Sequence, residues 1–298
     1  MRNAGPPLLT RKLRDLDHLR AASGLVSSGG ELYVIADDEL QLARFPAAGD
    51  APGTLLRLLP GELSEGAGQR KREKPDFEIL MRLPALPRYP QGALLALGSG
   101  SRPNRQRGAL VALDAEGRVA GEAAPVDAAP LFQRLGSLTG GLNLEGGWMH
   151  GATLRLLQRG HRDAGNLIFD VAFGALAAAL TNEGVLADVV PQRVQDMELG
   201  AIDGVRLTFT DGCGLPDGSW LFSAVAEDTV DAYADGAFAG ATLGLVDREG
   251  RLAWQRMLAP GGKVEGIHGE TTDAGLRILC VTDADDRLTP AQLLEARC

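Results

Sequence analysis

The sequence contains few cysteines, few aromatic residues and no long apolar run, and each shortage excludes a class of protein. Its three cysteines, Cys213, Cys280 and Cys298, are an odd number at spacings that fit neither a disulfide framework nor a zinc site, so we expect reduced thiols in a cytoplasmic protein. No stretch approaches the roughly 18 apolar residues that a membrane span needs, and the first residues lack the apolar core of a signal peptide. Aromatic residues make up 5% of the chain, and the signatures of WD40 and kelch repeats are missing, which excludes those repeat families.

Positive charge and amphipathic helices are also scarce. Thirty Lys and Arg residues stand against 39 Asp and Glu residues, and the net charge of -9 argues against nucleic acid or an anionic membrane as a partner. Only residues 128–137 and 173–184 have the pattern of short helices. A doubly wound sheet of alternating strands and helices is therefore not expected. Separately, we expect the protein to be a monomer.

What the chain does contain is many short strands of Leu, Val, Ile and Ala that end in Asp, Gly or Asn turns. Aligning them shows a four-strand unit that occurs five times, with a first strand that opens on a small or acidic polar residue: Ser23, Glu78, Glu145, Thr210 and Glu265. Successive spacings are 55, 67, 65 and 55 residues, and the path from the last of these through both chain ends back to the first is 56 residues.

Four-strand units at a fixed period are typical of β-propellers, and pairing the N-terminal strand with the last unit removes exposed sheet edges. We therefore predict an all-β, five-bladed β-propeller that forms a single domain over residues 1–298. A strand over residues 8–18 is expected to close the last blade. Six blades is the alternative, because the two longest intervals could hold further strands.

One end of the central channel is expected to collect polar side chains. In a propeller, the loop that enters the first strand of each blade and the loop between its second and third strands open on the same face. The five opening residues should therefore surround this mouth together with the residues that end the second strands, which include Asp37, Asp38, Ser99, Arg102, Arg159, Glu227 and Asp283.

The five opening residues offer only oxygen atoms as ligands. Three carboxylates converging on one axis would repel one another, and a hard cation relieves that repulsion. Calcium takes six to eight oxygen ligands, whereas zinc prefers Cys and His. We predict a calcium site formed by Ser23, Glu78, Glu145, Thr210 and Glu265. The alternative is that these side chains are hydrated in the channel or bond to the backbone.

Several cations interrupt this acidic background. Arg102 and Arg159 follow second strands, and Lys74 and Lys263 precede two of the inner glutamates, so we predict that they bind a small anionic ligand. The alternative is that Lys74 and Lys263 only neutralise the neighbouring glutamates. Residues 60–75 are rich in Gly and in charge, and we interpret them as either a mobile lid at the mouth or a disordered loop.

The strand starts ASGL, DFEIL, NLEGG and VEGI, with the stretches GSGSRPNR, LLQRG and VTDADD, resemble an uncharacterised bacterial propeller family over nearly the whole chain. The inner order Ser, Glu, Glu, hydroxyl, Glu also resembles the five-bladed calcium-activated nucleotidases, or apyrases. That resemblance implies a central calcium and hydrolysis of nucleoside diphosphates, although Thr210 stands where that family carries Ser and a secretory signal is missing. Phytase-like and esterase-like propellers have similar strand starts, so another phosphoester or ester substrate is equally compatible.

Two functions follow from these observations. The first is a calcium-dependent hydrolase of a phosphorylated or ester small molecule, in which Asp38, Glu227 or Asp283 is the base and the Arg residues stabilise developing charge. The second is a non-catalytic propeller that binds a ligand or a protein, with a structural metal. We interpret Cys213 as a structural thiol, because nothing nearby identifies an activating base. We interpret His161 and His268 as turn residues or as residues that support the site from behind, rather than as general bases.

Overall fold

The computed structural model describes residues 5–160, 165–228, 237–260, 262–286 and 288–298, and the protein is mostly β. Three sheets are four-stranded and follow the chain in order. The first contains β2 (Ala22–Ser28), β3 (Glu31–Ala36), β4 (Gln41–Pro46) and β5 (Thr54–Arg57). The second contains β6 (Phe77–Leu83), β7 (Ala93–Gly98), β8 (Arg107–Leu113) and β9 (Val119–Asp127). The third contains β10 (Leu144–His150), β11 (Thr153–Gln158), β12 (Asn166–Ala172) and β13 (Pro191–Met197).

The remaining strands form a nine-stranded sheet made of two antiparallel parts. One part contains β14 (Ala201–Ile202), β15 (Val205–Gly214), β16 (Trp220–Asp228), β17 (Ala237–Val246) and β18 (Leu252–Ala259). The other contains β19 (Val264–Thr272), β20 (Gly275–Thr282), β21 (Ala291–Arg297) and the N-terminal strand β1 (Leu8–Leu16). The two parts are joined where Leu8 and Leu9 pair in parallel with β18.

The N-terminal strand completes the last unit, as the spacing of the sequence predicts. β1 runs antiparallel to β21, from Thr10 opposite Ala296 to Leu16 opposite Ala291. The observed strand ends at Leu16, two residues before the predicted end. This pairing covers the edge that β21 would otherwise expose.

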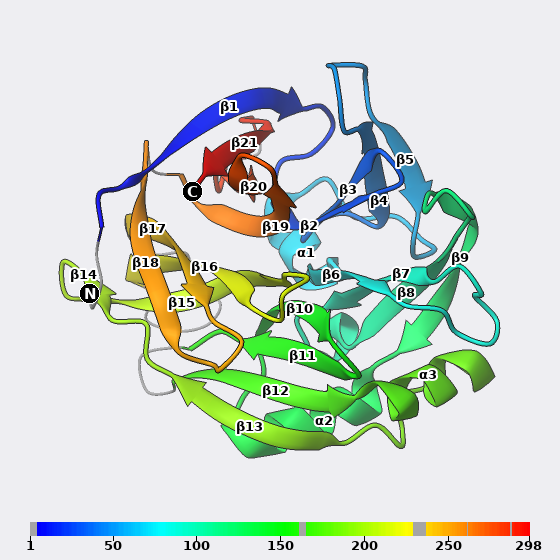
Figure 1. The fold of residues 1–298 in the computed structure, drawn as a ribbon. Helices are drawn as coiled ribbons and strands as arrows, with labels where there is room; N and C mark the ends of the chain where they lie inside the picture. The colour runs from blue at the N-terminus through cyan, green and yellow to red at the C-terminus, as the bar shows by residue number, and fades with distance from the viewer. Residues whose placement is uncertain (1–4, 161–164, 229–236, 261, 287) are drawn as a thin grey trace.

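The first strand of each unit lies at the centre of the molecule. β2 contacts β6, β6 contacts β10, β10 contacts β15, β15 contacts β19, and β19 contacts β2 again. Figure 1 shows the sheets arranged around this centre, so the fold is propeller-like.

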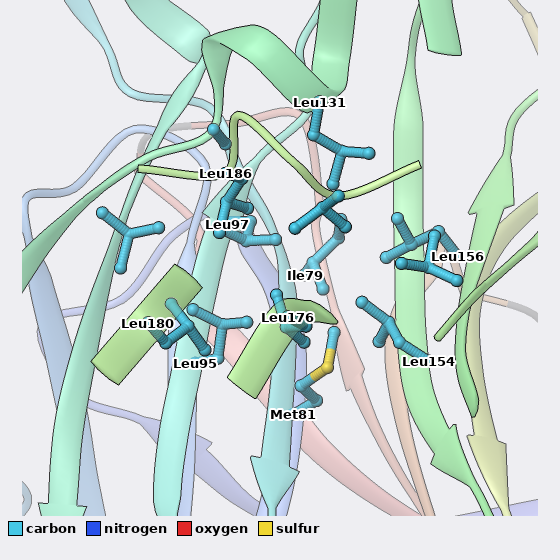
Figure 2. Packing of buried hydrophobic residues seen from close by; sticks show 14 of the residues in the cluster. Ile79, Met81, Leu95, Leu97, Leu131, Leu154, Leu156, Leu176, Leu180 and Leu186 are labelled. Carbon is cyan, nitrogen blue, oxygen red and sulfur yellow. The ribbon is translucent and has the colours of Figure 1, made fainter. Parts of the chain in front are cut away.

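Most of the hydrophobic core lies between neighbouring sheets. The strands β7 and β3 are almost continuously buried because sheets pack on both of their faces, which explains runs such as ALLALG. Figure 2 shows one cluster, in which Leu95 of β7 and Leu156 of β11 pack with Leu131 and Leu176 from two helices.

Those helices confirm two predictions and account for the long intervals. α2 (Ala129–Thr139) and α3 (Phe173–Asn182) match the helices expected at 128–137 and 173–184, and they occupy the two longest repeats. A third helix, α1 (Ala67–Glu73), was not predicted and lies within residues 60–75. No helix in the described part of the chain is long and apolar enough to cross a membrane.

Candidate functional site

Each of the five opening residues lies at a β-bulge at the start of a first strand. The register of each first strand with its second strand shifts at this residue: Ser23, Glu78, Glu145, Thr210 and Glu265. A bulge inserts one residue that has no cross-strand partner and turns its side chain away from the regular alternation. The repeat read from the sequence is therefore also a repeat in backbone geometry.

Glycine follows the bulge in three units because the first strands approach closely there. A Cβ on Gly146 would lie 2.6 Å from Oδ1 of Asp211, and one on Gly266 would lie 2.9 Å from Cα of Gly24. Side chains other than hydrogen do not fit at such distances. In each Ser-Gly or Glu-Gly pair, the first residue marks the bulge and the glycine marks the close approach of the first strands.

The first-strand starts and the second-strand ends meet on one face, as predicted. The N–H of Asp37 donates to Ala21, that of Ser99 to Asp76, that of Arg159 to Asn143 and that of Asp283 to Lys263. Each bond joins the end of a second strand to the residue two positions before a bulge. We call this face the mouth.

The two hydroxyls of the predicted calcium shell are engaged with the backbone. Ser23 Oγ donates to the carbonyl of Phe77, and Thr210 Oγ1 lies 2.7 Å from the carbonyl of Val264 and 2.8 Å from Oγ of Ser223. Both residues are buried. These contacts link one unit to the start of the next, which is the backbone-bonding alternative considered for them.

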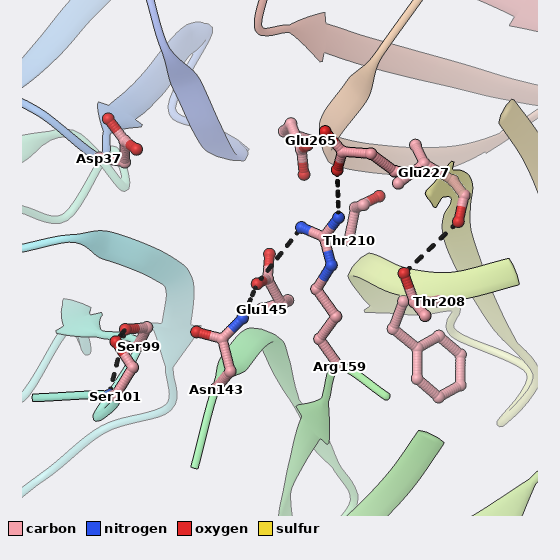
Figure 3. Close-up of polar contacts among 12 residues, drawn as sticks. Asp37, Ser99, Ser101, Asn143, Glu145, Arg159, Thr208, Thr210, Glu227 and Glu265 are labelled. Atoms are coloured by element: carbon pink, nitrogen blue, oxygen red, sulfur yellow. Dashed lines mark hydrogen bonds and ion pairs between the residues drawn. The ribbon is translucent and has the colours of Figure 1, made fainter. Parts of the chain in front are cut away.

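Arg159 lies between carboxylates from different units (Figure 3). Its guanidinium is 2.7 Å from Glu227 Oε2 and 3.6 Å from Glu145 Oε1, and Asn143 Nδ2 donates to Glu145 Oε1 at 2.5 Å. Burial raises the pKa of Glu145 to about 8, although the charge of Arg159 acts to lower it. Arg159 thus supplies internally the positive charge that these glutamates need.

Lys263 has the same role beside Arg159, and the two cations share the carboxylate of Glu227. Its Nζ lies 2.9 Å from Asp285, 3.4 Å from Glu265 and 3.8 Å from Glu227. Burial raises the pKa of Glu265, and the charge of Lys263 opposes that rise. The neutralising role considered for Lys263 in the sequence is therefore present in the structure.

A separate acidic group contains Asp37, Asp76 and Glu78. One carboxylate oxygen from each residue lies within 4.8 Å of the other two. Only Glu78 of the predicted calcium shell belongs to it. Lys74 Nζ contacts Asp37 Oδ2 and lies 2.9 Å from Asp76 Oδ1. Asp76 also accepts from Arg105 Nη1 at 2.7 Å.

The three carboxyls of this group differ in proton affinity. Burial raises the pKa of Asp37 to about 6, and burial together with Glu145 and Asp76 raises the pKa of Glu78 well above its usual value. Burial alone would also raise the pKa of Asp76, but Lys74 and Arg105 hold it below its ordinary value. Three carboxylate oxygens without His or Cys match the ligands that a hard divalent cation prefers, so this acidic triad could bind a metal.

A cavity of about 220 Å³ opens beside this triad. Asp283 lines it, and burial raises the pKa of its carboxyl to about 8. Asp38 also lines it, and Asp38 Oδ1 is buried without a hydrogen-bond partner. The complete lining is Arg20, Ala21, Asp37, Asp38, Arg70, Lys71, Lys74, Asp283, Asp285 and Asp286.

The cavity contains only part of the predicted site. Of the three predicted bases, Asp38 and Asp283 line it, whereas Glu227 is bound to Arg159 outside it. Of the predicted ligand-binding cations, Lys74 lines it, and Arg102, Arg159 and Lys263 do not. His161 lies outside the described residues. Burial raises the pKa of Cys213 to about 12, which fits the structural thiol that we predict.

Several residues of the mouth were missed by reasoning from the sequence. Asp76 and Asn143 stand two positions before a bulge, as Lys263 does, so the repeat itself marks them. Arg105, rather than Arg102, is the arginine of its loop that reaches Asp76. Arg70 lies on the unpredicted helix α1, and the sequence carried no signal for it.

Comparison with known proteins identifies a family but no activity. A luciferin-regenerating enzyme is 9% identical with a TM-score of 0.49, and the match covers 97% of this chain and 95% of that one. A mannose phosphorylase from Leishmania mexicana, in complex with phosphate, is 11% identical with a TM-score of 0.46, over 99% and 88% of the two chains. At these values the likeness carries no argument about activity. No curated protein matches the sequence. The chain belongs to the family of unknown function DUF6929, whose pattern covers residues 18–298.

Proposed function

We propose that the protein is a hydrolase of an ester or phosphoester small molecule and that it uses a divalent cation held by Asp37, Asp76 and Glu78. The observation that carries this proposal is the convergence of three carboxylate oxygens within 4.8 Å at the mouth, with Asp37 also lining the cavity. All three ligands are carboxylates, so calcium is the proposed ion. Lys74 has to move away from Asp37 and Asp76 before an ion can bind there.

The roles of the other residues follow from their positions. Asp283 is the proposed general base, because it lines the cavity and its pKa of about 8 allows it to exchange a proton near neutral pH. Arg70 and Lys71 line the same cavity and are the proposed cations that stabilise developing negative charge. When bound, the metal would supply Lewis-acid polarisation of a carbonyl or phosphoryl oxygen.

We also propose that the propeller has five blades. Five first strands contact one another in a closed cycle, and each carries a bulge at its start. The two long intervals that suggested a sixth blade contain the helices α2 and α3. A monomer in the cytoplasm without nucleic-acid or membrane partners remains our expectation, which size-exclusion chromatography and fractionation of cells would check.

The experiment that tests the proposed function is a calcium titration of metal-stripped protein by calorimetry, combined with a turnover screen. The wild type is expected to bind about one calcium ion, and Glu78→Gln to bind it at least about tenfold more weakly because a charged ligand is lost. Glu270→Gln, at the opposite end of a first strand, is the matched control and should bind as the wild type does. Absence of calcium binding by the wild type would overturn the metal site.

A non-catalytic, ligand-binding propeller is the second candidate. It is favoured by the ion pairs of Lys74, Arg159 and Lys263, which already compensate carboxylates at the mouth. The turnover screen separates the two functions. Calcium-dependent hydrolysis of esters, phosphoesters or nucleotides that stops with chelator or in Asp283→Asn supports the hydrolase, whereas calcium binding without turnover supports the second candidate.

A further inference from the structure

Residues 61–75 form a strap across the mouth. The strap connects the outer strand β5 to the first strand β6, and it contains helix α1. In the view of Figure 1, α1 lies over the centre of the molecule, and it contacts Asp38, Glu39 and Arg105 in loops at the mouth. Residues 68–73 are exposed or only partly buried, so the helix itself adds little to the hydrophobic core.

Leu63 anchors the start of the strap against a hydrophobic cluster, and polar contacts hold its helix α1 in place. Arg70 lies 3.1 Å from Asp38 Oδ2 and 2.6 Å from Glu39 Oε1. From the neighbouring unit, Asn104 Nδ2 donates to the carbonyl of Lys74 at 2.8 Å, and Arg105 Nη2 donates to that of Lys71 at 3.2 Å. The contacts of residues 70–74 can be replaced by water when this part of the strap lifts, whereas a packed apolar face would leave a void.

The strap carries its own cation into the acidic triad. Lys74, the residue that caps the C-terminus of α1, bonds through Nζ to Asp37 Oδ2 and Asp76 Oδ1. Its side chain is only 12% exposed. An oxygen that accepts from an ammonium group is not free to coordinate a metal ion on the same side, and two cations this close would repel each other.

We propose that Lys74 is a gating residue: its ammonium group occupies the cation position of the triad when the strap is closed, and a divalent ion that binds there displaces Lys74 and opens the strap. This inference rests on the metal site proposed above. Asp76 keeps its contacts with Arg105 and with Ser99 Oγ when Lys74 leaves, so the ligands do not need the strap to stay in position.

The coupling has to be reciprocal. If the ion opens the strap, then any change that opens the strap must strengthen binding of the ion by the same factor, typically between about 5-fold and 150-fold. Lys74→Met removes the competing ammonium and is expected to bind calcium at least about fivefold more tightly than the wild type. Arg72→Met removes one positive charge from an exposed position of the same helix and should differ from the wild type by less than about twofold.

Opening of the strap has a readout that does not depend on activity. Lys71 is exposed on α1, and a lysine-specific protease should cut after it only when the helix lifts and unwinds. We expect calcium to accelerate this cut in the wild type, as measured by mass spectrometry. In Lys74→Met the cut should be fast with or without calcium.

A second variant separates strap opening from the loss of a nearby charge. Arg70→Met breaks the contacts with Asp38 and Glu39 and leaves Lys74 and the triad unchanged. It should also accelerate the cut after Lys71 and tighten calcium binding, although less than Lys74→Met does. Tighter binding in Lys74→Met alone, with no effect of calcium on cleavage, would overturn the gate.

The remaining outcomes distinguish the two proposals. Equal calcium affinity in the wild type and Lys74→Met overturns the gate and leaves the metal site standing. Absence of calcium binding by the wild type overturns both. The unfolding midpoint of each variant, measured without metal, identifies any variant that fails to fold.

Discussion

The five bulge residues around the mouth have two roles, and the side-chain type decides which: a hydroxyl links two units, and a carboxyl supplies an acidic group. Ser23 and Thr210 donate to carbonyls of the next unit, whereas Glu145 and Glu265 occupy the equivalent bulges and pair with cations. A hydroxyl can satisfy a carbonyl, but a carboxylate cannot, because it carries no hydrogen to donate. The two hydroxyls therefore join units, and the glutamates concentrate acidic groups at the mouth.

The raised pKa of Asp283 can be tested by replacing that one residue. Its carboxyl is largely buried, and burial outweighs the effect of Lys263, so its pKa rises to about 8 in the folded protein. Asp37 and Asp285, which also face it, raise the pKa further. An unfolded chain loses this proton near its ordinary pKa, so the folded state loses stability as the pH rises from about 4 to about 8.

We therefore expect Asp283→Asn to lose less stability than the wild type does between about pH 5 and pH 8. The difference should be about 1 to 3 kcal/mol, because each pH unit is worth at most about 1.4 kcal/mol. Urea unfolding at both pH values measures it. Asp286→Asn is the control, since its neighbours lower the pKa of that exposed carboxyl and it is ionised at both pH values. Parallel curves for wild type and Asp283→Asn would contradict the prediction.

The residues of the bulges could be predicted from the sequence, but their partners could not. A period of about 60 residues marks the positions that face the channel, because each blade repeats the same backbone path. Arg159 and Glu227 meet from different units, 68 residues apart. No local pattern encodes that contact. The sequence therefore led us to interpret Glu227 as a base and Glu145 and Glu265 as calcium ligands, whereas the structure pairs them with Arg159 and Lys263.

At the scale of elements, β1 and α1 show why some segments are easier to predict than others. β1 has buried leucines at both ends and a place in the circular spacing, so its pairing could be predicted. α1 has the sequence AGQRKRE, with no apolar stripe, and contacts with Asp38 and Glu39 hold it. Helices of this length are marginal alone, and only tertiary contacts decide that one forms.

The contribution of β1 can be measured by comparing two leucines in that strand. Leu16 is fully buried in a hydrophobic cluster that includes Leu25 of β2 and Leu293 of β21, whereas Leu9 is 77% exposed. Leu16→Ala is expected to lower the free energy of unfolding by about 2 to 5 kcal/mol, because it removes buried methyl groups and leaves a cavity. Leu9→Ala makes the same chemical change and should stay within about 0.5 kcal/mol. Equal effects in chemical denaturation would show that β1 is not packed as described.

At the scale of the whole molecule, closure depends on a strand from one end of the chain pairing with a strand from the other. A single antiparallel pairing of β1 with β21 completes the last unit, and no covalent link spans it among the described residues. Among the described strands, chain order and spatial order differ at this point. Within the last unit, the pairing of β1 with β21 is the step that joins the two ends of the chain, while β19 also packs against β2.

A circular permutant tests whether β1 acts through pairing alone. Joining residue 298 to residue 1 through a short Gly-Ser linker, and opening the chain in the exposed turn at residues 48–50, preserves every strand pairing. We expect the permutant to fold and to unfold cooperatively with a free energy within about 2 kcal/mol of the wild type. Deleting residues 1–17 should instead cost more than about 4 kcal/mol, because it exposes the edge of β21 and removes the buried leucines of β1. Circular dichroism during urea unfolding distinguishes the two proteins. A truncated chain with an unchanged midpoint would mean that the ring closes without β1.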